Sequence, residues 1–150
     1  MRHLTIDSSF IPVNKDEIEY FELANNIVLP NYLKDFFVKY NGASTKEYKY
    51  YNKVDYIINS FLPLLKNRNA SVELILPAVR DEDEGIGRND LIPFATDPGG
   101  RPFYVSIGSN DEGVIYYDLV GLGDDEPLRK IANSFEEFIN GLHEETANDL

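Results

Sequence analysis

The sequence predicts a single α+β domain in which N-terminal helices and a C-terminal helix flank a mostly antiparallel, twisted sheet. The length of 150 residues is that of one domain. Two helical patterns come first, a series of strand patterns follows, and a capped helical pattern ends the chain. Because no Ser/Gly-rich or Pro-rich linker divides the chain, we expect one domain over residues 1–150, with its core at about 14–143.

The first helix is predicted to begin at Asn14. Asn14 and Glu17 have the spacing of a capping box, in which each side chain bonds the other residue's backbone N–H. Ile18 and Phe21 then share one face of the helix. The pattern ends near residues 25–26, where two asparagines follow each other.

The second helix is predicted between Pro30 and Gly42. Proline is well suited to the first turn of a helix, and glycine adopts the left-handed backbone that often ends one. Between these signals the apolar residues follow helical spacing at Leu33, Phe36, Phe37 and Tyr40.

The middle of the chain is predicted to hold a strand and a short helix. Residues 54–62 are rich in β-branched and aromatic residues, which predicts a strand with a bulge near residues 59–60. Residues 71–79 have helical spacing, although Pro77 interrupts them. Because proline costs about 3 kcal/mol inside a helix, we expect this helix to be short or kinked.

The second half of the chain is predicted to build an antiparallel hairpin. A short buried segment at 91–95 precedes the turn residues 97–100. Residues 102–107 and 114–119 alternate between apolar and polar, and the glycine-bounded connection between them favours antiparallel pairing.

The last helix is predicted to begin at Ser134. An apolar pattern that starts at Pro127 fits one long helix, but Ser134 and Glu137 have capping-box spacing. A helix that ran through Ser134 would leave this cap unused. We therefore expect a helix over about 134–143, preceded by an extended segment or short turn at 128–132.

The composition is acidic and lacks cysteine. With 14 Lys+Arg and 26 Asp+Glu, the formal net charge is −12, which argues against nucleic acids and anionic lipid surfaces and favours a basic partner. The absence of cysteine excludes disulfides and thiolate sites. We find no signal-peptide pattern and no apolar run of the roughly 18–20 residues that a membrane span requires. We therefore expect a cytoplasmic protein.

No residue pattern predicts catalysis, a metal site or a cofactor site. The two histidines, His3 and His143, lie near the termini, where order is poorest. The acidic run 81–84 lacks calcium-loop spacing, since position twelve is Ile92 rather than glutamate, so a solvated loop is the simpler interpretation. Residues 121–126 lack the lysine and hydroxyl residue of a phosphate-binding loop. We therefore expect a protein without enzymatic activity.

Four short motifs occur in an order that a known family shares. They are Leu29-Pro30 before a helix that ends at Asn41-Gly42, residues 91–95 followed by Asp97 and Gly99-Gly100, the strand 114–116, and residues 131–138. This series resembles the SUKH superfamily, which includes the fungal cell-wall-synthesis regulators, and the resemblance runs from about Ile18 to Leu142. The chain departs from the family in lacking a tryptophan in its first half and in its segment 47–53.

The resemblance implies a non-enzymatic binding scaffold without a cofactor. Many bacterial members look like immunity proteins that bind and neutralise a cognate toxin, whereas eukaryotic members are signalling and cell-wall hubs with long disordered flanks. Because this chain has no such flanks, the resemblance favours an immunity protein. The net charge of −12 adds the expectation that its target is a basic toxin domain such as a nuclease, whose cleft for nucleic acid is basic. The alternative is a regulatory interaction module with an endogenous partner and no toxin.

Two sets of residues are candidates for partner binding. Loop acids can steer a basic partner and imitate phosphate charge, and we expect three acidic loops to gather at one end of the sheet. Tyrosines are enriched at interfaces, although an ordinary two-stranded ribbon with a half-buried tyrosine face is the simpler explanation of their pattern. The acids are Asp81, Glu82, Asp83, Glu84, Asp111, Glu112, Asp124, Asp125 and Glu126, and the tyrosines are Tyr48, Tyr50 and Tyr51.

Overall fold

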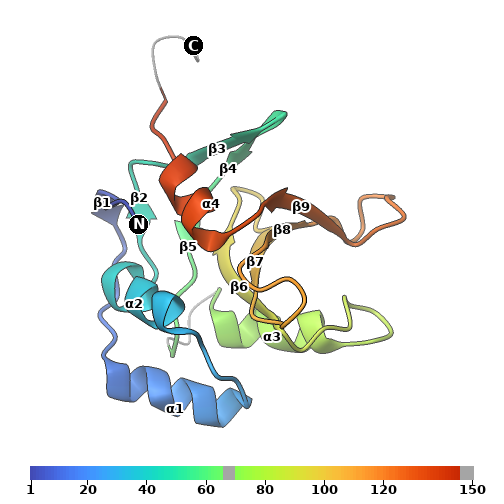
Figure 1. Ribbon diagram of the computed structural model, residues 1–150, viewed down its shortest axis with the longest axis horizontal. Helices are drawn as coiled ribbons and strands as arrows, with labels where there is room; N and C mark the ends of the chain where they lie inside the picture. Colours follow the sequence, from blue (N-terminus) through green and yellow to red (C-terminus); the bar gives the residue numbers. More distant parts are fainter. Residues whose placement is uncertain (66–69, 146–150) are drawn as a thin grey trace.

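The structure is a computed structural model that describes residues 1–65 and 70–145 (Figure 1). Its helices are α1 (Lys15–Asn25), α2 (Asn31–Tyr40), α3 (Val72–Arg80) and α4 (Phe135–Gly141). Its strands are β1 (Ile6–Ser8), β2 (Ser44–Thr45), β3 (Lys49–Asn52), β4 (Val54–Ile57), β5 (Ser60–Phe61), β6 (Leu91–Thr96), β7 (Pro102–Ser106), β8 (Ile115–Asp118) and β9 (Leu128–Ala132). The predicted α+β class, with a mostly antiparallel sheet, is confirmed.

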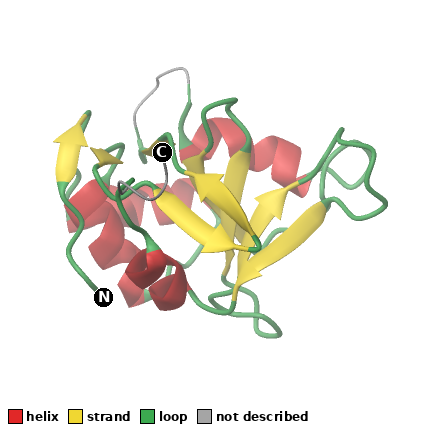
Figure 2. Cartoon of the chain, turned by 90° about the horizontal axis from the view of Figure 1, so that it is seen from above, coloured by secondary structure: helices red, strands yellow, loops and turns green. Residues whose placement is uncertain are grey.

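The main sheet has five antiparallel strands in the order β5-β6-β7-β8-β9. Figure 2 shows its strands twisting relative to one another, with helices on both sides. Leu91 pairs with Ser106 at one end of the sheet, and Thr96 pairs with Pro102 at the other. We call these the Leu91 end and the Thr96 end. The connections before β6 and between β7 and β8 lie at the Leu91 end, whereas the connection between β8 and β9 lies at the Thr96 end.

Both faces of this sheet are covered by helices. Adjacent residues of a strand point to opposite faces. Phe103 in β7 packs on Phe138 of α4, with ring centroids 6.1 Å apart, whereas its neighbour Tyr104 clusters with Val79 of α3. α4 and α3 therefore cover opposite faces, which explains why every residue of β6 is buried.

Aromatic rings join α2 and α4 to the sheet. The Phe135 ring of α4 lies 5.0 Å from Phe36 of α2 and 5.3 Å from Phe94 of β6, in both cases edge to face. Such edge-to-face pairs add stabilisation beyond the apolar area that they bury. α1 packs against α2 and lies farther from the sheet (Figure 1).

The predicted signals of the first two helices are confirmed. Asn14 Oδ1 accepts from the Glu17 N–H at 2.8 Å, and Glu17 Oε1 accepts from the Asn14 N–H at 3.1 Å. α1 buries Ile18 and Phe21. After α2, Gly42 takes a φ of +72°, the left-handed conformation that its position required.

The last helix also begins where its cap predicts. Ser134 Oγ accepts from the Glu137 N–H at 3.0 Å, and α4 starts at Phe135. The Glu137 carboxylate accepts a 2.8 Å hydrogen bond from the Asn133 N–H. In a standard capping box it would accept from the N–H of the cap residue itself, here Ser134. The residues before Ser134 form β9, so the alternative of one long helix from Pro127 is wrong.

The predicted strand at 54–62 differs in the structure, because it is divided between two sheets. β4 pairs with β3, whereas β5 pairs with β6. The change of partner falls between Ile58, whose N–H bonds to Tyr48, and Asn59, whose N–H bonds to Thr96. The predicted helix at 71–79 is confirmed as α3, with Ser71 as its cap and Pro77 inside.

Candidate partner-binding surface

The three acidic loops do not gather at one end of the sheet. The loops that carry residues 81–84 and 111–112 lie at the Leu91 end, but residues 124–126 lie at the Thr96 end (Figure 1). The expectation of a single cluster is therefore wrong for Asp124, Asp125 and Glu126. The reason is topological, because successive connections of an antiparallel meander alternate between the ends of the sheet.

The loop after α3 is shaped by Asp81. Its Oδ1 accepts from the N–H groups of Asp83 at 2.8 Å and Glu84 at 3.1 Å, and these hydrogen bonds lower the pKa of Asp81. A side chain at Gly85 would collide with the carbonyl oxygen of Ala78, so the loop folds back tightly on α3. Asp81 thus has a structural role within the turn.

The other acids of this loop carry charge that the described residues leave unpaired. The side chains of Glu82, Asp83 and Glu84 are exposed. Across residues 1–65 and 70–145, no ion pair or hydrogen bond engages their carboxylates. Their charge is therefore available to an approaching molecule.

Asp111 is held inside the surface rather than presented on it. Burial alone would raise its pKa, but hydrogen bonds from Arg88, Ser106 and Tyr116 outweigh burial and lower the pKa of Asp111 to about 2. Arg88 donates to both carboxylate oxygens at 3.1 Å, and it also donates to Asp90 at 2.8 Å. Arg88 thereby joins the loop before β6 to the loop after β7.

Glu112 differs from Asp111 in both exposure and partners. Its side chain is exposed, and it makes no ion pair with any other described residue. Because Arg88 is already engaged by Asp90 and Asp111, it does not neutralise the neighbouring acids. The free negative charge of these two loops therefore belongs to residues 82–84 and Glu112.

The three candidate tyrosines have different environments on the β3–β4 hairpin. Tyr50 is only 6% exposed, and its ring lies 4.7 Å from that of Phe138 in α4. Tyr48 is half-buried, and its hydroxyl lies 3.2 Å from Glu145 Oε2. Tyr51 is 65% exposed. Tyr50 therefore lies on the buried face of this two-stranded ribbon. Tyr51 is the candidate tyrosine whose ring is exposed to solvent.

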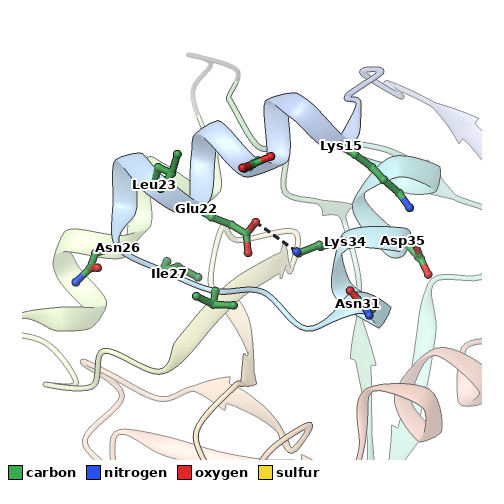
Figure 3. Close-up of a pocket in the computed structure, with 10 residues that line it drawn as sticks. Lys15, Glu22, Leu23, Asn26, Ile27, Asn31, Lys34 and Asp35 are labelled. Atoms are coloured by element: carbon green, nitrogen blue, oxygen red, sulfur yellow. Dashed lines mark ion pairs between the residues drawn. The ribbon is translucent and has the colours of Figure 1, made fainter.

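A groove of about 710 Å³ lies between α1 and the start of α2 (Figure 3). Glu22 crosses it, with an ion pair to Lys34 at 3.4 Å and a 2.7 Å hydrogen bond from the Leu29 N–H. Leu23 and Val28 are exposed at its rim. The lining side chains carry charges of both signs, so this groove does not select for a basic partner.

A second pocket of about 420 Å³ opens at the Leu91 end, and we call it the Tyr32 pocket. The Tyr32 hydroxyl oxygen is buried and has no hydrogen-bond partner in the part of the chain that the structure describes. The sequence did not indicate this site, because Tyr32 looked like an ordinary helix residue. The lining residues are Met1, Tyr32, Glu112, Gly113, Ser134, Phe135 and Glu136.

The described part of the chain holds neither a group of metal-ligating side chains nor a helix that could cross a membrane. Within residues 1–65 and 70–145, no three His, Asp or Glu side chains lie close enough together to hold a metal ion. Over the same residues, the helices are too short or too polar to cross a bilayer.

Comparison with known proteins places the chain in a family. The sequence is 25% identical over 167 residues to the SPbeta prophage-derived uncharacterized protein YokK of Bacillus subtilis (strain 168), an alignment that covers 97% of this chain and 83% of that protein. The sequence pattern of the SMI1 / KNR4 family (SUKH-1) matches residues 12–141, which run from just before α1 to the end of α4. The chain therefore belongs to the SMI1 / KNR4 family (SUKH-1).

Proposed function

We propose that this chain is a cytoplasmic immunity protein that binds a cognate toxin domain through a basic surface of the toxin. Membership of the SUKH-1 family is consistent with an immunity or interaction module and supports a role in binding rather than in catalysis. The observation that favours a basic partner is the unpaired acidic surface at the Leu91 end. Binding blocks the toxin's active site or its path for substrate.

The arrangement of charge supports fast recognition of such a partner. Glu82, Asp83, Glu84 and Glu112 lie on two loops that Arg88 and Asp111 tie together. Like charges on neighbouring loops attract the same basic partner, and salt weakens this attraction because the screening length is about 8 Å at physiological ionic strength. A toxin that cleaves nucleic acid needs a basic cleft, and carboxylates can occupy it in place of phosphates.

The first test is co-expression with the toxic C-terminal domain of a large secreted protein encoded beside this chain's gene. We expect growth to be rescued and the two proteins to co-purify in equal amounts. Toxicity that persists despite expression of the folded chain would count against the proposal.

The second test compares two variants, each of which neutralises three acidic residues, at opposite ends of the sheet. The triple variant Glu82→Gln, Asp83→Asn, Glu84→Gln leaves Asp81 in place to hold the turn. Its matched control neutralises Asp124, Asp125 and Glu126, which are also exposed but lie at the Thr96 end. We expect only the first variant to slow association strongly and to flatten its dependence on salt, because rim charges act mainly on association rates. If both variants slowed association equally, the effect would come from the net charge of the chain and not from the position of these acids.

A regulatory module with an endogenous partner is the second candidate, and the groove between α1 and α2 favours it. Leu23 and Val28 are among the most exposed large apolar side chains that the structure describes. A partner bound there would be held by apolar contact, so salt would affect its binding little. Leu23→Ser would then weaken binding, whereas the acidic triple variant would not.

A further inference from the structure

The Tyr32 pocket contains a buried polar group without a partner. The hydroxyl oxygen of Tyr32 is buried and accepts or donates no hydrogen bond among the described residues. Its ring is fixed against Phe135, with centroids 5.7 Å apart. Burial, followed by the nearby charge of Glu112, raises the pKa of Tyr32, so the hydroxyl is neutral at physiological pH. An unsatisfied buried hydroxyl is costly, and a ligand that bonds to it recovers that cost.

The backbone leaves this pocket open. Gly113 is buried and has a φ of +86°, a conformation that favours glycine. A Cβ added at Gly113 would lie 3.8 Å from the Tyr32 hydroxyl oxygen, so a side chain here would enter the pocket. The volume of about 420 Å³ falls within the range of about 300–1,000 Å³ typical of ligand pockets.

The charges around the pocket indicate the sign of its ligand. Glu112 comes from the loop between β7 and β8, and Glu136 comes from the first turn of α4. Both side chains are exposed, and neither forms an ion pair with another described residue. No lysine or arginine side chain lines the pocket, and the α-ammonium of Met1 is the one cationic group among the lining residues, against two carboxylates. An anion would be repelled by both carboxylates, whereas a cation would be attracted by both.

We propose that the Tyr32 pocket receives an arginine side chain of the protein partner. A guanidinium has five donors in a planar arrangement, so one group can serve the phenolic oxygen and a carboxylate together. It also stacks on aromatic rings, and the partly buried ring of Tyr32 lines the pocket. This inference rests on the proposed function in one respect, namely that the partner is basic.

A titration of the isolated chain tests the pocket without any toxin. N-acetyl-arginine amide is added into the millimolar range while backbone amide NMR signals are followed, with N-acetyl-lysine amide and N-acetyl-glutamate amide as comparison ligands. We expect saturable shifts centred on Gly113 and Phe135 for the arginine ligand, and weaker shifts for lysine. No saturation, equal binding of lysine, or stronger binding of glutamate would each overturn the assignment.

Three variants identify the groups responsible. Tyr32→Phe removes only the hydroxyl and keeps the ring against Phe135, and we expect it to weaken arginine binding several-fold. The double variant Glu112→Gln, Glu136→Gln should weaken binding and remove most of its salt dependence. The matched control is Glu126→Gln, an exposed acid at the opposite end of the sheet, which should bind as the wild type does. Wild-type binding by Tyr32→Phe would overturn the role of the hydroxyl.

The same variants separate failure of the pocket from failure of the proposed function. With the cognate toxin, Tyr32→Phe should dissociate about tenfold faster and associate at the wild-type rate, since loss of a buried contact acts on dissociation. If Tyr32→Phe dissociates normally while the acidic triple variant associates slowly, the pocket inference fails and the proposed function stands. If the chain binds no toxin but saturates with N-acetyl-arginine amide, the proposed function fails and the pocket inference stands.

Discussion

Arg88 donates to both carboxylate oxygens of Asp111, each over 3.1 Å, and this pair connects the two loops of the candidate surface. The side chains are 28% and 19% exposed, so solvent screens the pair less than it screens a fully exposed one. The hydroxyls of Ser106 and Tyr116 donate to the same carboxylate. One acid therefore holds the loops in place, and its unpaired neighbours carry the charge that a partner meets.

Asp111→Asn should destabilise the fold although Asn is nearly the same size. The change removes the charge that strengthens the hydrogen bonds from Arg88, and hydrogen bonds to charged groups contribute about 1.5–3 kcal/mol when well formed. We expect a loss of about 1–2 kcal/mol in the free energy of unfolding, measured by urea denaturation. Glu112→Gln, one residue along, has no such partners and should change stability by less than about 0.5 kcal/mol. Equal losses would contradict the role of Asp111.

The stabilising effect of Asp111 should disappear in acid. Its pKa is lowered to about 2 from an ordinary value of 3.8. A carboxyl group with a lowered folded-state pKa stabilises the fold fully above its unfolded pKa, and this contribution is lost as the pH falls toward the folded pKa. The difference in unfolding free energy between wild type and Asp111→Asn should therefore be constant above about pH 5 and shrink between about pH 4 and 2. A difference that stays constant down to pH 2 would contradict this assignment.

Ser134→Ala should destabilise the start of α4. Ser134 Oγ accepts from the Glu137 N–H at 3.0 Å, and loss of such a cap costs about 1 kcal/mol. The measurement is urea denaturation, with Ser109→Ala as control because Ser109 is an exposed loop residue. Recovery of stability in Ser134→Asp, which restores a capping oxygen, would attribute the loss to the cap. A Ser134→Ala protein as stable as wild type would contradict it.

The sequence predicted the helices well because their signals are local. Asn14 with Glu17, and Ser134 with Glu137, lie three residues apart, and each side chain reaches a backbone group of its own turn. In the same way, Gly42 ended α2 at the residue that needed a left-handed backbone. Such short-range chemistry depends little on the rest of the fold.

The candidate site was harder to predict because its contacts are long-range. Asp111 resembled any loop acid until the fold placed Arg88, 23 residues earlier, beside it. The positions of the acidic loops depended on strand order, which the composition does not encode. Tyr32 became notable only when Gly113 and Phe135 enclosed its hydroxyl.

The division of β4 from β5 had a similar cause. The residues are rich in strand formers throughout, so the local pattern predicted one strand. The break arises because the Ile58 N–H bonds to Tyr48, just before β3, whereas the Asn59 N–H bonds to Thr96 of β6 in the main sheet. A pattern of propensities does not report which partner a strand will find.

Tyr50 and Tyr51 are neighbours whose substitutions should separate stability from binding. Tyr50 packs on Phe138 with ring centroids 4.7 Å apart, so Tyr50→Ala should cost about 3–5 kcal/mol in urea denaturation, whereas exposed Tyr51→Ala should cost less than about 0.5 kcal/mol. Because the acidic surface is proposed to bind the partner, Tyr51→Ala should also bind the cognate toxin normally. If Tyr51→Ala instead abolishes binding, while the variant neutralised at residues 82–84 keeps wild-type salt dependence, the β3–β4 hairpin is the interface.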